Sequence, residues 1–131
     1  MDPALERRIH DAYAAFGRRD VDAFLEVFDP DAKLINPEYA VEGGIRHGRD
    51  GVRTALMNLH EQFDYERVEV EQIEEGPDGV LVVFRMVVSG RVSGAPLDQC
   101  FAHAIRLRDG LVVDFRWFRT AAEARHAVGL R

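Results

Sequence analysis

The order of helical and strand patterns along the chain is the feature that most limits its fold. Apolar residues recur at helical spacing near the start, from Leu5 to Phe16, and Gly17 is placed to end that helix. Asp20 can cap a second helix whose apolar face runs to Phe28, where Asp29-Pro30-Asp31 ends it. Helices followed by a meander of antiparallel strands are typical of an α+β domain.

The middle of the chain predicts a short strand, a loop and a third helix. Residues 32–36 form the strand, which Pro37 closes, and residues 38–50 form a loop with three glycines. The third helix runs from about Gly51 to Phe63. We therefore expect three helices in the first half of the chain.

The second half predicts four strands and a helical tail. Gly76-Pro77-Asp78-Gly79 and Asp109-Gly110 are turn signals of the kind that join antiparallel strands. The four strands and the tail are expected at residues 66–75, 80–89, 97–108, 111–119 and 121–128.

Length and composition exclude several classes of protein. The 131 residues suit a single domain spanning 1–131, and the 47% hydrophobic content is that of a folded chain. The net charge of −6 argues against nucleic acid as a partner, because phosphate binding needs clustered positive charge. No apolar run is long enough for a membrane span. The absence of a signal-peptide pattern and the single cysteine favour a cytoplasmic location.

Strand alternation predicts which side chains face the interior. In residues 97–108 the odd positions form the interior face, which carries two polar residues, Gln99 and His103, beside Phe101. In residues 111–119 the odd positions include Phe115, Trp117 and Arg119. An interior arginine needs an internal carboxylate or an anionic ligand group as its partner. The sequence therefore predicts a pocket with an apolar wall and a few polar groups.

The opposite face of the same two strands is small and apolar. Cys100, Ala102 and Ala104 share it, with Phe118 on the next strand. Such a patch suits contact between two sheets, so we expect a homodimer through the outer face. A merely solvated convex face is the alternative.

Several short motifs follow one another along the chain, at residues 17–32, 36–37, 47–52, 108–112 and 123–130. In this order they resemble motifs of the SnoaL-like proteins of the nuclear transport factor 2-like superfamily, which includes ketosteroid isomerases and polyketide cyclases. The resemblance covers essentially the whole chain.

This resemblance implies a cone-shaped α+β fold, in which a strongly curved, mainly antiparallel sheet packs on three N-terminal helices and encloses a pocket. The general base of a ketosteroid isomerase would fall on Asn36, an amide that cannot accept a proton in that role. The tyrosine of the oxyanion hole would fall at or next to Ala12, with Tyr13 one position away. Its protonated aspartate would fall on His103, and an aromatic residue of the last strand on Arg119.

The candidate polar residues each admit a functional and a structural interpretation. His103 suits proton transfer near neutral pH, or it is a core histidine satisfied by a neighbour. Asn36 either orients a ligand by hydrogen bonding or caps the turn before Pro37. Glu38 is the carboxylate nearest to the missing base, or a solvated loop residue. Arg119 binds a ligand carboxylate or pairs with an acid such as Glu38.

The remaining candidates are ligand contacts in the wall and at the mouth of the pocket. The aromatic ones could equally be core residues, since core and pocket wall are contiguous in such a fold. Histidine spacing predicts no metal site, and no glycine-rich phosphate loop follows a strand. The full set of expected ligand contacts is Tyr13, Asn36, Glu38, Tyr39, Gln99, Phe101, Phe115, Trp117 and Arg119, with His103 as the catalytic candidate.

Together these observations predict a small-molecule-binding protein. The ligand is expected to be mainly apolar, with an anionic or carbonyl group, because arginines predominate in the later strands. Cofactor-free acid/base catalysis of the isomerase, cyclase or hydratase class is the enzymatic form of this hypothesis. A ligand-sensing or protein-interaction module that has lost its catalytic acid is the alternative. A network linking His103, Arg119 and a carboxylate would favour the enzyme.

Overall fold

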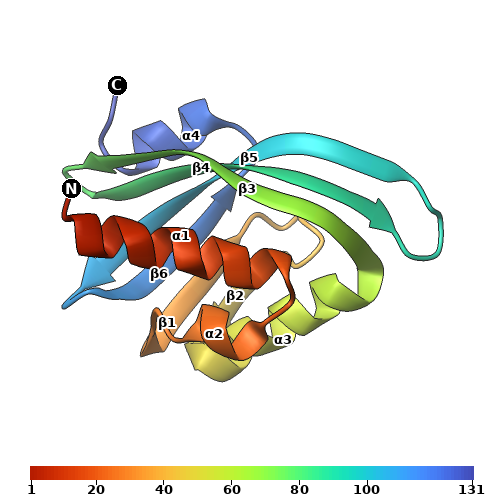
Figure 1. Ribbon diagram of the computed structural model, residues 1–131. Helices are drawn as coiled ribbons and strands as arrows, with labels where there is room; N and C mark the ends of the chain where they lie inside the picture. Colours follow the sequence, from red (N-terminus) through yellow and green to blue (C-terminus); the bar gives the residue numbers. More distant parts are fainter.

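A computed structural model describes all 131 residues and shows an α+β fold built around one curved sheet (Figure 1). The helices are α1 (Pro3–Gly17), α2 (Val21–Leu25), α3 (Gly48–Gln62) and α4 (Ala121–Ala127). The strands are β1 (Phe28–Asn36), β2 (Gly44–His47), β3 (Phe63–Gly76), β4 (Gly79–Gly90), β5 (Pro96–Arg108) and β6 (Leu111–Phe118).

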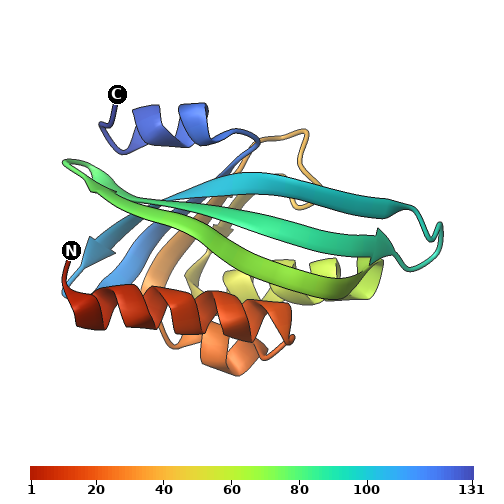
Figure 2. The same ribbon diagram turned by 45° about the horizontal axis from the view of Figure 1, so that its top comes forward.

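The six strands form a single open sheet in the order β2-β1-β6-β5-β4-β3. Every neighbouring pair is antiparallel except β1 and β6, which are parallel. Helices α1, α2 and α3 lie on one side of the sheet, and α4 lies on the other (Figure 2). The expected fold class, a mainly antiparallel curved sheet packed on three N-terminal helices, is confirmed.

The first two helices begin after aspartates, as the sequence predicts for Asp20. The Asp2 carboxylate accepts a hydrogen bond from the Ala4 N–H at 3.0 Å, and the Asp20 carboxylate accepts one from the Ala23 N–H at 3.1 Å. Each bond satisfies an N–H group that has no partner within the helix. None of the helices is long and apolar enough to cross a membrane.

The second helix is shorter than expected, and the first strand is longer. Helix α2 ends at Leu25, and Phe28 begins β1 instead of completing the helical face. Phe28 has no exposed surface, and its ring lies 5.2 Å from that of Phe24 and 5.4 Å from that of Phe115. The pairing of β1 with β6 shifts register between Phe28 and Lys33, so Pro30, which has no N–H to donate, falls within the irregular part.

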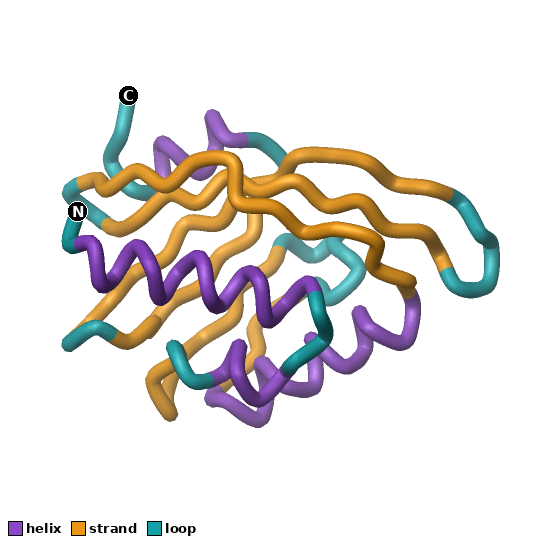
Figure 3. The backbone as a smooth tube through the Cα atoms, viewed as in Figure 1, coloured by secondary structure: helices purple, strands orange, loops and turns teal.

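The expected loop at residues 38–50 contains a strand and the start of a helix. Strand β2 pairs with β1 from Lys33 opposite His47 to Asn36 opposite Gly44. It has only four residues, too few for an alternating pattern to be visible in the sequence. Helix α3 begins at Gly48, three residues earlier than predicted, and β3 follows it directly at Phe63 (Figure 3).

The outer face of the sheet is covered by the chain's own last helix, and this corrects the interpretation of its small residues. Ala102 and Ala104 are buried in a cluster with Leu81 on the neighbouring strand and Ala124 and Val128 at the end of the chain. The small side chains let α4 pack closely on the sheet. They are therefore not free to contact a second copy.

Two residues of the expected dimer patch remain partly or fully accessible. Phe118 packs against the cluster beneath α4 without being fully buried, and Cys100 is exposed. Helix α4 begins at Thr120, whose hydroxyl accepts a hydrogen bond from the Glu123 N–H at 3.3 Å. A homodimer stays a prediction, and Ala102 and Ala104 can take no part in its interface.

The packing of α4 predicts a large effect from Leu81→Ala. Leu81 has no exposed surface, so truncation loses transfer free energy and leaves a cavity beneath the helix. We expect the free energy of unfolding, measured by urea denaturation, to fall by about 2–5 kcal/mol. Val92→Ala is the control because Val92 is fully exposed, and we expect a change within about 0.5 kcal/mol. Equal effects of the two substitutions would show that α4 does not pack as described.

Candidate functional site

A cavity of about 320 Å³ lies between the inner face of the sheet and the helices. It falls at the lower end of the range of about 300–1,000 Å³ that is typical of small-molecule pockets. Of its 23 lining residues, 19 are hydrophobic. The polar or charged ones are Asn36, Glu42, His103 and Arg119.

The apolar wall comes from both layers of the fold. Helix α3 contributes one face, which includes Val52 and Leu56, and the sheet contributes Phe84 and Met86 from β4. All five expected aromatic contacts also line the cavity: Tyr13, Tyr39, Phe101, Phe115 and Trp117. The rings of Phe101 and Trp117 lie 5.2 Å apart.

Tyr13 and His103 form a buried hydrogen-bonded pair in the wall. The Tyr13 hydroxyl lies 2.6 Å from His103 Nδ1. The imidazole is stacked on the Phe84 ring, with centroids 4.4 Å apart, and lies 4.1 Å from the ring of Phe115. His103 therefore fits both interpretations offered by the sequence. Its Nδ1 is hydrogen-bonded to a neighbour, as in a core histidine, and its side chain also lines the cavity.

Burial keeps both members of this pair uncharged at neutral pH. Desolvation lowers the pKa of His103 to about 3, because the charged imidazolium has no water around it. Desolvation likewise raises the pKa of the Tyr13 hydroxyl well above its usual value. With Nδ1 bonded to Tyr13, Nε2 is the nitrogen left to meet a ligand, as donor or acceptor according to the tautomer.

Asn36 is held at the end of β1 by the loop that follows it. Its Nδ2 donates to the backbone carbonyl oxygen of Glu42 at 2.9 Å. Its Oδ1 is buried and has no hydrogen-bond partner. The side chain therefore ties the loop to the strand and still has an unsatisfied acceptor.

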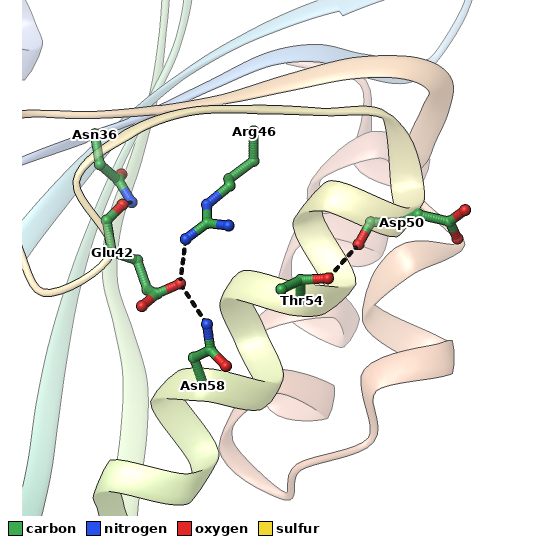
Figure 4. Close-up of polar contacts among 6 residues, drawn as sticks. All are labelled: Asn36, Glu42, Arg46, Asp50, Thr54 and Asn58. Carbon is green, nitrogen blue, oxygen red and sulfur yellow. Dashed lines mark hydrogen bonds and ion pairs between the residues drawn. The ribbon is translucent and has the colours of Figure 1, made fainter.

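Glu42 is the carboxylate of the cavity wall, a residue that no pattern in the sequence had singled out. Only 8% of the residue is exposed. Its Oε1 accepts hydrogen bonds from Arg46 Nη2 at 2.9 Å and from Asn58 Nδ2 at 3.0 Å (Figure 4). Arg46 comes from β2 and Asn58 from α3, so three elements meet at this side chain.

Two successive turns place Glu42 in the wall. The Ala40 N–H donates to the Pro37 carbonyl and the Gly43 N–H to the Ala40 carbonyl, both at 3.0 Å. A Cβ at position 43 would lie 2.6 Å from the carbonyl oxygen of Glu38, so only glycine fits this close approach. Periodicity gives no direction to side chains in such a loop. The glycine after Glu42 was the only local signal that distinguished it from Glu38.

The mouth of the cavity carries Tyr39 and Arg119. Tyr39 is exposed, and its ring lies 6.3 Å from that of Trp117. The guanidinium carbon of Arg119 lies 4.7 Å from the centroid of the Tyr39 ring, a cation–π arrangement. Strand β6 ends at Phe118, so Arg119 is exposed and not part of an interior face as predicted. It forms no ion pair with Glu38.

Two of the expected ligand contacts lie outside the cavity. Gln99 is exposed, although Leu97 and Phe101 on the same face of β5 line the cavity. Glu38 is exposed in the loop after Pro37. The network expected of an enzyme does not form: His103 bonds to Tyr13, Arg119 lies over Tyr39, and the carboxylate in the cavity lining pairs with Arg46.

Comparison with known proteins gives a family and a fold. Residues 9–115 match the family model of the SnoaL-like domain. No curated protein matches the sequence. Among solved structures, an NTF2-like protein of unknown function from Burkholderia pseudomallei is 23% identical, with a TM-score of 0.78 over 95% of this chain and 97% of the other.

Two further structures with the same fold contain small molecules. TerC, co-crystallised with polyporic acid, is 22% identical, with a TM-score of 0.75 over 95% of this chain and 97% of the other. A protein with a ketosteroid isomerase-like fold from Catenulispora acidiphila, in complex with trimethylamine, is 14% identical. Its TM-score is 0.76, over 100% of this chain and 96% of the other.

The burial of His103 predicts a loss of stability in acid. The pKa of His103 is lower in the folded than in the unfolded chain, so the unfolded state binds a proton first as the pH falls below about 6.5. Between pH 6.5 and pH 4 we expect the free energy of unfolding of the wild type to fall by about 3 kcal/mol more than that of His103→Gln. Urea denaturation across this range measures the difference.

A matched control is His10→Gln, because His10 is exposed on α1 and folding changes its hydration little. This variant should follow the pH dependence of the wild type. Parallel curves for the wild type and His103→Gln would contradict the burial of a neutral imidazole.

Proposed function

The chain belongs to the SnoaL-like domain family, and we propose that it binds a small, mainly apolar molecule in the cavity between its helices and the inner face of its sheet. The observation that carries this proposal is the cavity itself. Close-packed protein interiors contain few voids larger than a water molecule, whereas this one measures about 320 Å³. Burial of an apolar ligand against its hydrophobic wall supplies the driving force.

The few polar groups would orient the ligand within this apolar space. His103 Nε2 offers a neutral hydrogen-bonding atom on the sheet side, and Asn36 and Glu42 offer polar atoms on the side of β1 and the loop. The relatives solved with polyporic acid and with trimethylamine support small organic molecules as ligands of this fold.

The geometry favours binding over acid/base catalysis through the residues expected from sequence. Asn36 is an amide and cannot serve as the general base, and its nitrogen is engaged with the Glu42 carbonyl. A histidine whose pKa is about 3 is a weak proton acceptor near neutral pH. We therefore propose a ligand-binding or ligand-sensing role, with His103 as a hydrogen-bonding residue of the pocket.

A larger side chain on β4, one that projects into the cavity, tests the proposal of ligand binding. Met86 lines the cavity, so Met86→Trp should occupy part of the ligand's space. Titration with N-phenyl-1-naphthylamine, a neutral dye whose fluorescence rises in apolar surroundings, should show one saturable site per wild-type chain. We expect Met86→Trp to weaken dye binding by about tenfold or more, because a loss of roughly 1.4 kcal/mol of binding free energy raises the Kd tenfold.

Val87→Trp is the matched control, because alternation places the next residue of β4 on the opposite face, away from the cavity. It adds the same side chain and should leave dye binding unchanged. Absence of saturable binding in the wild type, or equal effects of the two variants, would refute the proposal.

A further inference from the structure

We propose that Glu42 and Asn36 form an acceptor site in the cavity wall for a hydroxyl or amino group of the ligand. The ligand would then be an apolar alcohol, phenol or amine, and not a carboxylic acid. This inference rests on the proposed function, because it names the ligand class of the same cavity. Its basis is which oxygen atoms of Glu42 and Asn36 already accept hydrogen bonds and which do not.

Only one of the two carboxylate oxygens of Glu42 accepts hydrogen bonds from neighbouring side chains. Both donors that reach the carboxylate, Arg46 Nη2 and Asn58 Nδ2, bond to Oε1. Figure 4 shows the second oxygen pointing away from both. An ionised carboxylate has about four acceptor positions, so Oε2 keeps its capacity to accept hydrogen bonds. Glu42 lines the cavity, whereas Arg46 and Asn58 do not.

Asn36 adds a second acceptor next to Glu42. A backbone carbonyl can only accept, so the bond to the Glu42 carbonyl fixes Nδ2 on that side and Oδ1 on the other. Oδ1 is buried without a partner. An unsatisfied buried acceptor is unfavourable, and a ligand donor that reaches it removes that cost. The bond ties the Asn36 side chain to the backbone of Glu42, and Arg46 and Asn58 hold the Glu42 side chain itself.

No cation is positioned beside these acceptors to receive an anionic ligand. Among the charged side chains that line the cavity, only Arg119 is positive, and it lies exposed at the mouth over Tyr39. Arg46 is already paired with Oε1. A ligand carboxylate would thus meet the carboxylate oxygen of Glu42. The expectation of an anionic ligand depended on an interior Arg119, which the structure does not have.

Three naphthalenes of similar shape test the inference without any substitution. 2-Naphthol donates a hydrogen bond, 2-methoxynaphthalene cannot, and 2-naphthoate is an anion at pH 7. By isothermal titration calorimetry at pH 7, we expect the wild type to bind 2-naphthol about tenfold more tightly than 2-methoxynaphthalene. The difference is the contribution of one hydrogen bond from the ligand hydroxyl to a charged acceptor. 2-Naphthoate should bind most weakly.

Glu42→Gln assigns the preference to this side chain. The glutamine oxygen can still accept from Arg46 and Asn58, but an NH₂ group then replaces Oε2 and donates instead of accepting. We expect the preference for 2-naphthol over 2-methoxynaphthalene to fall to less than about threefold. Glu38→Gln is the matched control, since Glu38 is exposed on the same loop outside the cavity, and it should keep the wild-type preference.

The outcomes separate this inference from the proposed function. If the wild type binds all three compounds with equal affinity, or if Glu42→Gln folds and keeps the preference, the acceptor site is refuted and the binding cavity stands. Tightest binding of 2-naphthoate also refutes it and points to Arg119 at the mouth. If none of the three binds, the proposed function fails, and the inference fails with it. If Glu42→Gln does not fold, the ranking of the three compounds by the wild type decides.

Discussion

The parallel pairing of β1 with β6 is the contact on which the rest of the structure depends. It is the single parallel pair in the sheet, and it joins a strand from the first third of the chain to the last strand. Burial of Phe28 between Phe24 and Phe115 stabilises its start, and irregular register accommodates Pro30. Because β1 is held there, its far end brings Asn36 and the following loop to the cavity.

The polar groups of the interior are held in place by one another as well as by the backbone. Tyr13 and His103 satisfy each other in an aromatic surrounding, and Glu42 is held by donors from β2 and α3. Polar atoms that cost free energy to bury thus have partners, with the exception of a few that include Asn36 Oδ1. Paired groups fix the shape of the wall, while Asn36 Oδ1 stays unpaired in a residue that lines the cavity.

Much of the fold could be read from the sequence because local patterns carry it. Strands β4, β5 and β6 lie close to their predicted bounds, and Asp109-Gly110 forms the predicted turn with positive φ values of 53° and 79°. Alternation placed His103 and Trp117 on the cavity side. It failed for Arg119, which lies beyond the last residue of β6, and strand ends depend on tertiary pairing. Gln99 shares its face with Leu97 and Phe101, which line the cavity, yet it is exposed.

The sequence by itself determined the order of helices and strands, the faces of the long strands and the family, because each follows from short-range periodicity or from motifs in a fixed order. Only the tertiary structure decided that Glu42 and not Glu38 is the carboxylate of the cavity, that Arg119 lies at its mouth, and that α4 covers Ala102 and Ala104. The physical reason is that loop side chains and sheet faces are directed by contacts between residues far apart in the chain, and those contacts have no periodicity to read.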